Sequence, residues 1–162
     1  MPTLARAAAF AAGFTLVAVT RLDAQSSKIS VTIAGGPHAG TYEMSDQCEV
    51  NPDKFPSMFM MAYTVGAVKP TSPRSIEFFT ASGNGKPDGF VVAVQFPGKA
   101  GQRIAYELNA IPPELKPPVA LPPQGRGSVT VRQTGSGRTA TFRGITHDGV
   151  RMEGSVDCRS RS

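Results

Sequence analysis

The stretch "TFRGITHDGVRMEGSVDC", residues 141–158, decides the fold because its side chains alternate as in paired β-strands. After Gly149, apolar or small residues occupy every second position, and the positions between them are polar. The first set comprises Val150, Met152, Gly154, Val156 and Cys158. The second set comprises Arg151, Glu153, Ser155 and Asp157. This pattern is typical of a strand with one face on a core and the other in solvent.

The length of the turn before this strand follows from the requirement that Phe142 face the core. A two-residue turn at Asp148-Gly149 would pair Phe142 with Ser155 and place the phenylalanine on the polar face. A three-residue loop over 147–149 pairs Phe142 with Gly154 instead, and every apolar residue then faces the same side. The sequence therefore predicts the longer loop.

The longer loop also accounts for the glycine at position 149, and it determines which residues of the outer face lie opposite each other. Three-residue hairpin loops end on a residue with positive φ, which glycine adopts at little steric cost. The register sets Arg143 opposite Glu153 and Thr141 opposite Ser155, and each such pair contributes a few tenths of a kcal/mol.

The amino terminus predicts export. Arg6 precedes an apolar run over 7–19, and the small Ala24 stands near its end, as in a signal peptide. We expect a signal peptide over 1–24 and one mature domain over 25–162. No cysteine precedes Cys48, so we expect no lipid anchor.

The mature chain is expected to be soluble and mildly basic. No later segment approaches the ~20 apolar residues of a membrane span, so no transmembrane anchor is expected. The 17 basic residues less Arg6 and Arg21 leave 15, and the 12 acidic residues less Asp23 leave 11, a net charge of +4.

The two cysteines, Cys48 and Cys158, predict a disulfide. Exported chains mature in an oxidising compartment, where paired cysteines are the rule. Cys158 continues the apolar face of its strand, and Cys48 continues the alternation of Tyr42 and Met44, so both sulfurs are expected to point inward. The alternative is two buried free thiols.

The rest of the chain consists of short alternating segments between Gly, Pro and Asn clusters. We count about nine strands, which predicts an all-β, single-domain antiparallel β-sandwich or flattened barrel. A Pro-rich loop over 111–127 carries six of the 14 prolines and interrupts the pattern.

Catalytic, metal and cofactor residues are not predicted. His38 and His147 stand in glycine-rich turns without metal-ligand spacing, and we interpret both as solvated turn residues. The cysteines are consumed by pairing. An enzyme is not excluded, but it would need carboxylates distant in the sequence to converge.

Arginines gather in the carboxyl-terminal half, and three of them are candidate anion-binding residues: Arg132, Arg143 and Arg151. All three fall on the predicted outer face, and the planar guanidinium suits carboxylate, sulfate or phosphate. Glu153 and Asp157 share that face, so a solvated charge pattern that protects the sheet is the alternative.

A second candidate site is the stretch "MFMMAYTV". Met58, Phe59, Met60, Met61 and Tyr63 form a candidate apolar pocket, because methionine adapts to varied apolar ligands. The alternative is ordinary core packing of a strand covered on both faces.

Three segments resemble one known group of proteins: "AGTYEMSDQC" (39–48), "GRGSVTVRQTGSG" (125–137) and "FRGITHDGVRMEGSVDC" (142–158). The ordering is similar to small exported bacterial domains of uncharacterised function, some of them lipoproteins. The resemblance covers most of the mature chain and implies a β-sandwich without catalytic residues.

Together these patterns predict an exported periplasmic or secreted module that acts by binding or as a structural envelope component, without catalysis. The expected partner is an anionic surface polymer, and nothing in the sequence indicates nucleic acid. The alternative function is a carrier of an apolar, lipid-like ligand in the Met/aromatic pocket.

Overall fold

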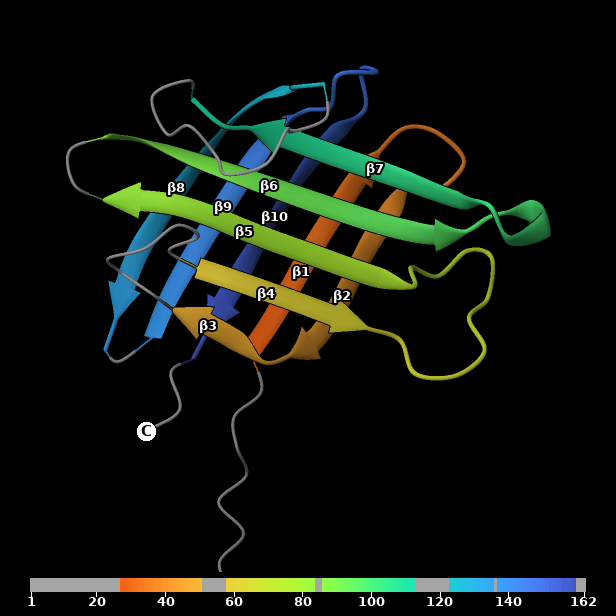
Figure 1. Ribbon diagram of the computed structural model, residues 1–162, viewed down its shortest axis with the longest axis horizontal. Coiled ribbons are helices and arrows are strands. Elements are labelled where there is room, and N and C mark those ends of the chain that lie inside the picture. Colours follow the sequence, from red (N-terminus) through yellow and green to blue (C-terminus); the bar gives the residue numbers. More distant parts are fainter. Residues whose placement is uncertain (1–26, 51–57, 84–85, 113–122, 136, 160–162) are drawn as a thin grey trace, which may run out of the picture.

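The structure, a computed structural model, describes residues 27–50, 58–83, 86–112, 123–135 and 137–159. It consists of two five-stranded antiparallel sheets packed face to face (Figure 1). The predicted β-sandwich is confirmed. The predicted signal peptide lies outside the described residues.

The first sheet has the strand order β2-β1-β10-β9-β8. Its strands are β2 (Gly40–Asp46), β1 (Ser27–Ala34), β10 (Arg151–Cys158), β9 (Gly137–Ile145) and β8 (Arg126–Thr134).

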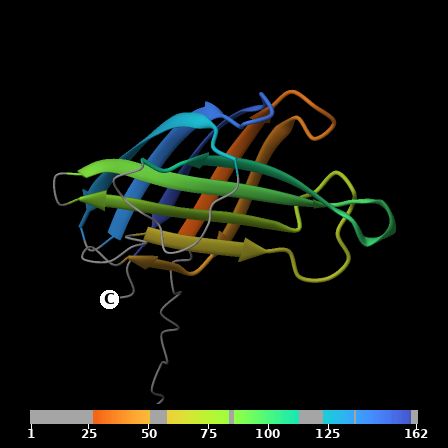
Figure 2. The same cartoon turned by 45° about the horizontal axis from the view of Figure 1, so that its top comes forward.

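The second sheet has the order β3-β4-β5-β6-β7. Its strands are β3 (Cys48–Val50), β4 (Met58–Tyr63), β5 (Ser75–Gly83), β6 (Lys86–Pro97) and β7 (Arg103–Ala110), with the short 3₁₀ helix η1 (Lys99–Gly101) before β7. Its strands cross those of the first sheet, and the tilted view in Figure 2 separates the two layers.

The described residues form ten strands where about nine were expected, and the additional strand is β3. Tyr42, Met44 and Cys48 alternate without a break, so the sequence marks no end of a strand between them. In the structure, β2 ends at Asp46 and β3 begins at Cys48, so the chain changes sheets across Gln47. The alternation continues across the change because the even-numbered side chains of both strands face the core.

The predicted hairpin register is confirmed. Phe142 pairs with Gly154 and Arg143 with Glu153. The Thr146 amide donates to the Val150 carbonyl at 2.8 Å, and Gly149 has a φ of 90°. The loop over 147–149 is therefore the three-residue loop that the position of Phe142 required.

Replacing Gly149 with valine is expected to destabilise the protein more than replacing Asp148 with alanine. A β-branched residue at φ 90° costs about 1–3 kcal/mol in backbone strain. Asp148 accepts a hydrogen bond from the Thr146 hydroxyl, a contact worth about 1 kcal/mol. Urea unfolding of the two variants measures the ranking, and the reverse order would contradict the loop geometry.

The core is organised around Phe142, which reaches from the first sheet toward the second. Its ring lies 5.7 Å from the ring of Phe78 and 5.9 Å from that of Phe90. Gly154 is the cross-strand partner of Phe142, and a Cβ built on it would lie 2.6 Å from the tip of that ring. The absence of a side chain at Gly154 therefore gives the Phe142 ring its place in the core.

The predicted disulfide between Cys48 and Cys158 is confirmed, with a Cα–Cα distance of 5.4 Å. Cys48 begins β3 in the second sheet, and Cys158 ends β10 in the first. The bridge joins the two layers beside the point where the chain passes from one to the other.

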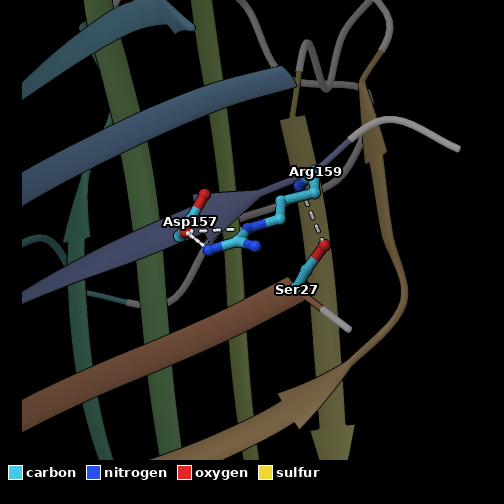
Figure 3. A network of polar contacts seen from close by, with 3 residues as sticks. All are labelled: Ser27, Asp157 and Arg159. Carbon is cyan, nitrogen blue, oxygen red and sulfur yellow. Dashed lines mark hydrogen bonds and ion pairs between the residues drawn. The ribbon is translucent and has the colours of Figure 1, made fainter. Parts of the chain in front are cut away.

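The carboxyl end of β10 is also bound to the start of β1 (Figure 3). The Arg159 amide donates to the Ser27 hydroxyl at 3.0 Å. The Arg159 guanidinium donates to Asp157 Oδ2 from Nε at 3.1 Å and from Nη2 at 3.0 Å. Arg159 and Asp157 thus neutralise each other at this end of the first sheet.

Two residues of β7 depart from the alternation of inward and outward side chains, and the bounds of the predicted Pro-rich loop are corrected. Asn109 has the same parity as the exposed Arg103, yet it is fully buried. Ile104 has the same parity as the buried Tyr106 and Leu108, yet it is 39% exposed. The loop predicted over 111–127 ends earlier, since Arg126 and Gly127 already pair within the first sheet.

Candidate functional site

The outer face of the first sheet carries a hollow of about 540 Å³. Three arginines from adjacent strands line it: Arg126 from β8, Arg143 from β9 and Arg151 from β10. We call this hollow the arginine groove. The other lining residues are Thr32, Ala34, Gly127, Ser128, Gly144, Ile145, Met152 and Glu153.

The strand register places the three arginines on one part of the outer face. Ile145 pairs with Arg126 on one side and with Arg151 on the other, so these arginines lie two strands apart, about 10 Å. Arg143 points to the same face two residues before Ile145. All three stems therefore lie within reach of one bound group.

The charges of the groove are not balanced by ion pairs. Among the described residues, the ion pairs are Lys28 with Glu43 and Arg159 with Asp157, and neither includes a groove arginine. Glu153 lines the groove and faces Arg143 across the strands, but the two do not form an ion pair. Three cationic groups and one carboxylate leave the groove with a net positive charge.

The structure brings together two of the three predicted anion-binding residues. Arg143 and Arg151 line the groove, whereas Arg132 lies outside it. Arg132 is four residues beyond Ser128 on β8, about 13 Å along the strand.

Arg126 lines the groove but was not among the candidate residues predicted from the sequence. It had been assigned to the Pro-rich loop, where no facing direction follows from the sequence. The alternation of side chains could have identified it, because Arg126 and Arg132 are six residues apart and share one face of an uninterrupted strand.

The five residues of the predicted apolar pocket divide between two faces of β4. Met58 and Met60 are fully buried between the sheets. Phe59, Met61 and Tyr63 alternate with them and lie on the outer face of the second sheet, where Tyr63 is 54% exposed. Strict alternation therefore separates the methionine-rich segment into two sets, and the ligand carrier stays a prediction.

His38 lies in a turn as predicted, but the interpretation that it is solvated is wrong, because it is half-buried. Its ring stacks on Phe96 with centroids 4.2 Å apart, and its Nδ1 lies 3.1 Å from the Tyr106 hydroxyl. The Tyr42 hydroxyl donates to the His38 carbonyl at 2.9 Å. Burial, and after it the neighbouring Tyr106, raises the pKa of Tyr42. His38 thus helps to close one end of the sandwich, while His147 is exposed in its loop.

A carboxylate pair lies on the outer face of the second sheet. Glu77 and Glu107 are both cross-strand partners of Ala93, so they lie on either side of its small side chain. Gln95 Nε2 donates to Glu77 Oε1 at 3.1 Å. Burial first, and then the charge of Glu77, raises the pKa of Glu107 above its ordinary 4.5, while His147 acts in the opposite direction.

Replacing Glu107 with glutamine is expected to raise the melting temperature at neutral pH. A raised carboxyl pKa means that the folded state holds the proton more tightly, so stability falls as the pH rises from the ordinary pKa through the raised one. The variant should lose this dependence, so its advantage at pH 7 should shrink below about pH 4.

The matched control is Glu49→Gln, which removes an exposed carboxylate outside the pair. It should leave the melting temperature unchanged at both pH values. A Glu107→Gln variant that melts below the wild type at pH 7 would contradict the unfavourable ionisation of Glu107.

Within the described ranges, no three His, Cys, Asp or Glu side chains form a group that could hold a metal ion. In the same part of the chain, no helix is long and apolar enough to cross a membrane.

No protein-family model, curated protein or solved structure matches the chain. The resemblance to small exported bacterial domains therefore stays a prediction.

Proposed function

We propose that this protein is an exported, non-catalytic binding module whose ligand is an anionic surface polymer held in the arginine groove. One observation carries the proposal: Arg126, Arg143 and Arg151 surround one hollow, and no described carboxylate forms an ion pair with them. An anionic group on a ligand would supply the missing charge.

The chemistry of the groove suits an oxyanion. A guanidinium presents several N–H donors in a plane and binds carboxylate, sulfate or phosphate through paired hydrogen bonds. The volume of about 540 Å³ falls within the usual range of about 300–1,000 Å³ for ligand sites. Thr32 and Ser128 add hydroxyl groups to the lining.

Export is supported by two independent features. The amino-terminal pattern is that of a signal peptide. The Cys48–Cys158 disulfide is a bond that persists in oxidising compartments. A protein in such a compartment meets the charged polymers of a cell surface, which fits the positive groove.

Replacing Arg143 and Arg151 together with glutamine is expected to weaken binding to a sulfated polysaccharide. On a heparin column, the double variant should elute at clearly lower salt than the wild type, because two charge-assisted contacts are lost. Replacing Arg74 and Arg103 together with glutamine is the matched control, since it also removes two exposed arginines, both outside the groove. If the double variant and the control elute together, the groove is not the binding site.

A further inference from the structure

We propose that the ligand is an extended acidic polysaccharide that runs from the arginine groove over a row of hydroxyl groups to Arg132. This inference rests on the proposed function and names the substrate class. The shared chemistry is a hydroxyl-rich chain with carboxylate or sulfate groups at intervals. Three features of the outer face of the first sheet support it.

The first feature is a continuous row of short hydroxyl side chains beside the groove. The register places Thr130, Thr141, Ser155 and Ser30 side by side on four neighbouring strands. Neighbouring strands are about 4.8 Å apart, so the row offers one hydroxyl at each step across the sheet. Within the described residues, none of the four hydroxyls hydrogen-bonds to another protein group.

The second feature is Arg132, which lies beyond this row. It is two residues past Thr130 on β8, and its side chain is exposed with no ion pair among the described residues. Cationic groups therefore stand on both sides of the hydroxyl row. From Ser128, at the groove, to Arg132 the distance is about 13 Å, which one small anion does not span.

The third feature is where the positive charge is neutralised. On the β1–β2 side, Lys28 pairs with Glu43 at 2.7 Å. At the end of β10, Arg159 pairs with Asp157. On the outer face of the first sheet, the described cations without an ion pair therefore lie on β8, β9 and the start of β10, which defines a path along these strands.

The composition of the face favours a polysaccharide over other polyanions. The outward positions of β1, β8, β9 and β10 include no aromatic residue, whereas single-stranded nucleic acid is held largely by stacking on aromatic rings. Hydroxyl side chains both donate and accept hydrogen bonds, so they complement the hydroxyls of a sugar chain. The arginines complement its charged groups.

The test compares a heparin disaccharide with a heparin dodecasaccharide by calorimetry, using two variants outside the groove. Arg132→Gln and Thr141→Val should each weaken binding of the dodecasaccharide about three- to tenfold, the effect of one lost polar contact. Neither should change binding of the disaccharide. Arg143→Gln, within the groove, should weaken both. Ser45→Ala, at an exposed position of β2 opposite Lys28, serves as the control.

Each result distinguishes this inference from the proposed function. If Arg143→Gln weakens both oligosaccharides while Arg132→Gln and Thr141→Val match the wild type, the ligand is confined to the groove and the extended path is wrong. If no oligosaccharide binds, or Arg143→Gln has no effect, the proposed function fails as well. Tighter binding of poly-glutamate or single-stranded DNA than of the dodecasaccharide would overturn the polysaccharide assignment. Binding of heparin without binding of polygalacturonate would narrow the recognised group to sulfate and support an acidic polysaccharide as the ligand.

Discussion

Replacing both Cys48 and Cys158 with alanine is expected to lower the free energy of unfolding by about 5 kcal/mol in the chain-entropy model. The bridge joins residues 110 positions apart, so it strongly restricts the unfolded chain. A domain of this size has only about 5–15 kcal/mol of stability, so the variant should lose much of it. Urea unfolding measures the loss.

The single variants provide the control. Cys48→Ala and Cys158→Ala each break the same bond, so each should cost nearly as much as the double variant. If the double variant loses less than about 1 kcal/mol, the two sheets are held together without help from the bridge. If the two single effects add, the cysteines contribute by packing rather than by their bond.

Replacing Gly154 with alanine is expected to destabilise the protein by about 3 kcal/mol. The added Cβ would collide with the backbone carbonyl oxygen of Ser30 and lie 2.6 Å from the Phe142 ring. Because β10 is the central strand of its sheet, neither neighbour can retreat without disturbing another strand. The melting temperature and the near-ultraviolet signal of the packed aromatic residues should both fall.

Ser155→Ala is the matched control for Gly154→Ala. It changes the adjacent residue of the same strand, but on the exposed outer face, where substitutions usually change stability by less than about 0.5 kcal/mol. Equal stability of the two variants would mean that the Phe142 ring does not depend on the space above Gly154.

The carboxyl-terminal hairpin could be predicted from the sequence because its two faces differ sharply. A shift of one residue would move Phe142 from the core to solvent, so a single register satisfies the pattern. The disulfide was predictable for a related reason, since Cys158 continues the apolar face of its strand. In both cases the periodicity of a half-buried strand carried the information.

The features that escaped prediction depend on contacts between distant segments. The passage from β2 to β3 leaves the alternation intact, so nothing in the sequence marks the change of sheet. His38 follows glycines and a proline, as a solvated residue would, but Phe96 and Tyr106 of the second sheet surround its ring. The burial of Asn109 likewise arises from tertiary packing.

The candidate site was predicted in part for the same reason. Parity alone placed Arg143 and Arg151 on the outer face, and the register then set them on neighbouring strands. Their meeting with Arg126 depends on where β8 begins, which the prolines before it concealed. Parity also grouped Arg132 with them, but it carries no information on distance along the strand.

The most direct test of the central claim is a backbone amide NMR titration with a heparin tetrasaccharide. We expect the largest shift changes at the amides around Arg126, Arg143 and Arg151, with the amides of β4 and β5 unchanged. Shift changes centred on the second sheet, or none at concentrations that saturate binding to heparin, would contradict the assignment of the ligand to the arginine groove.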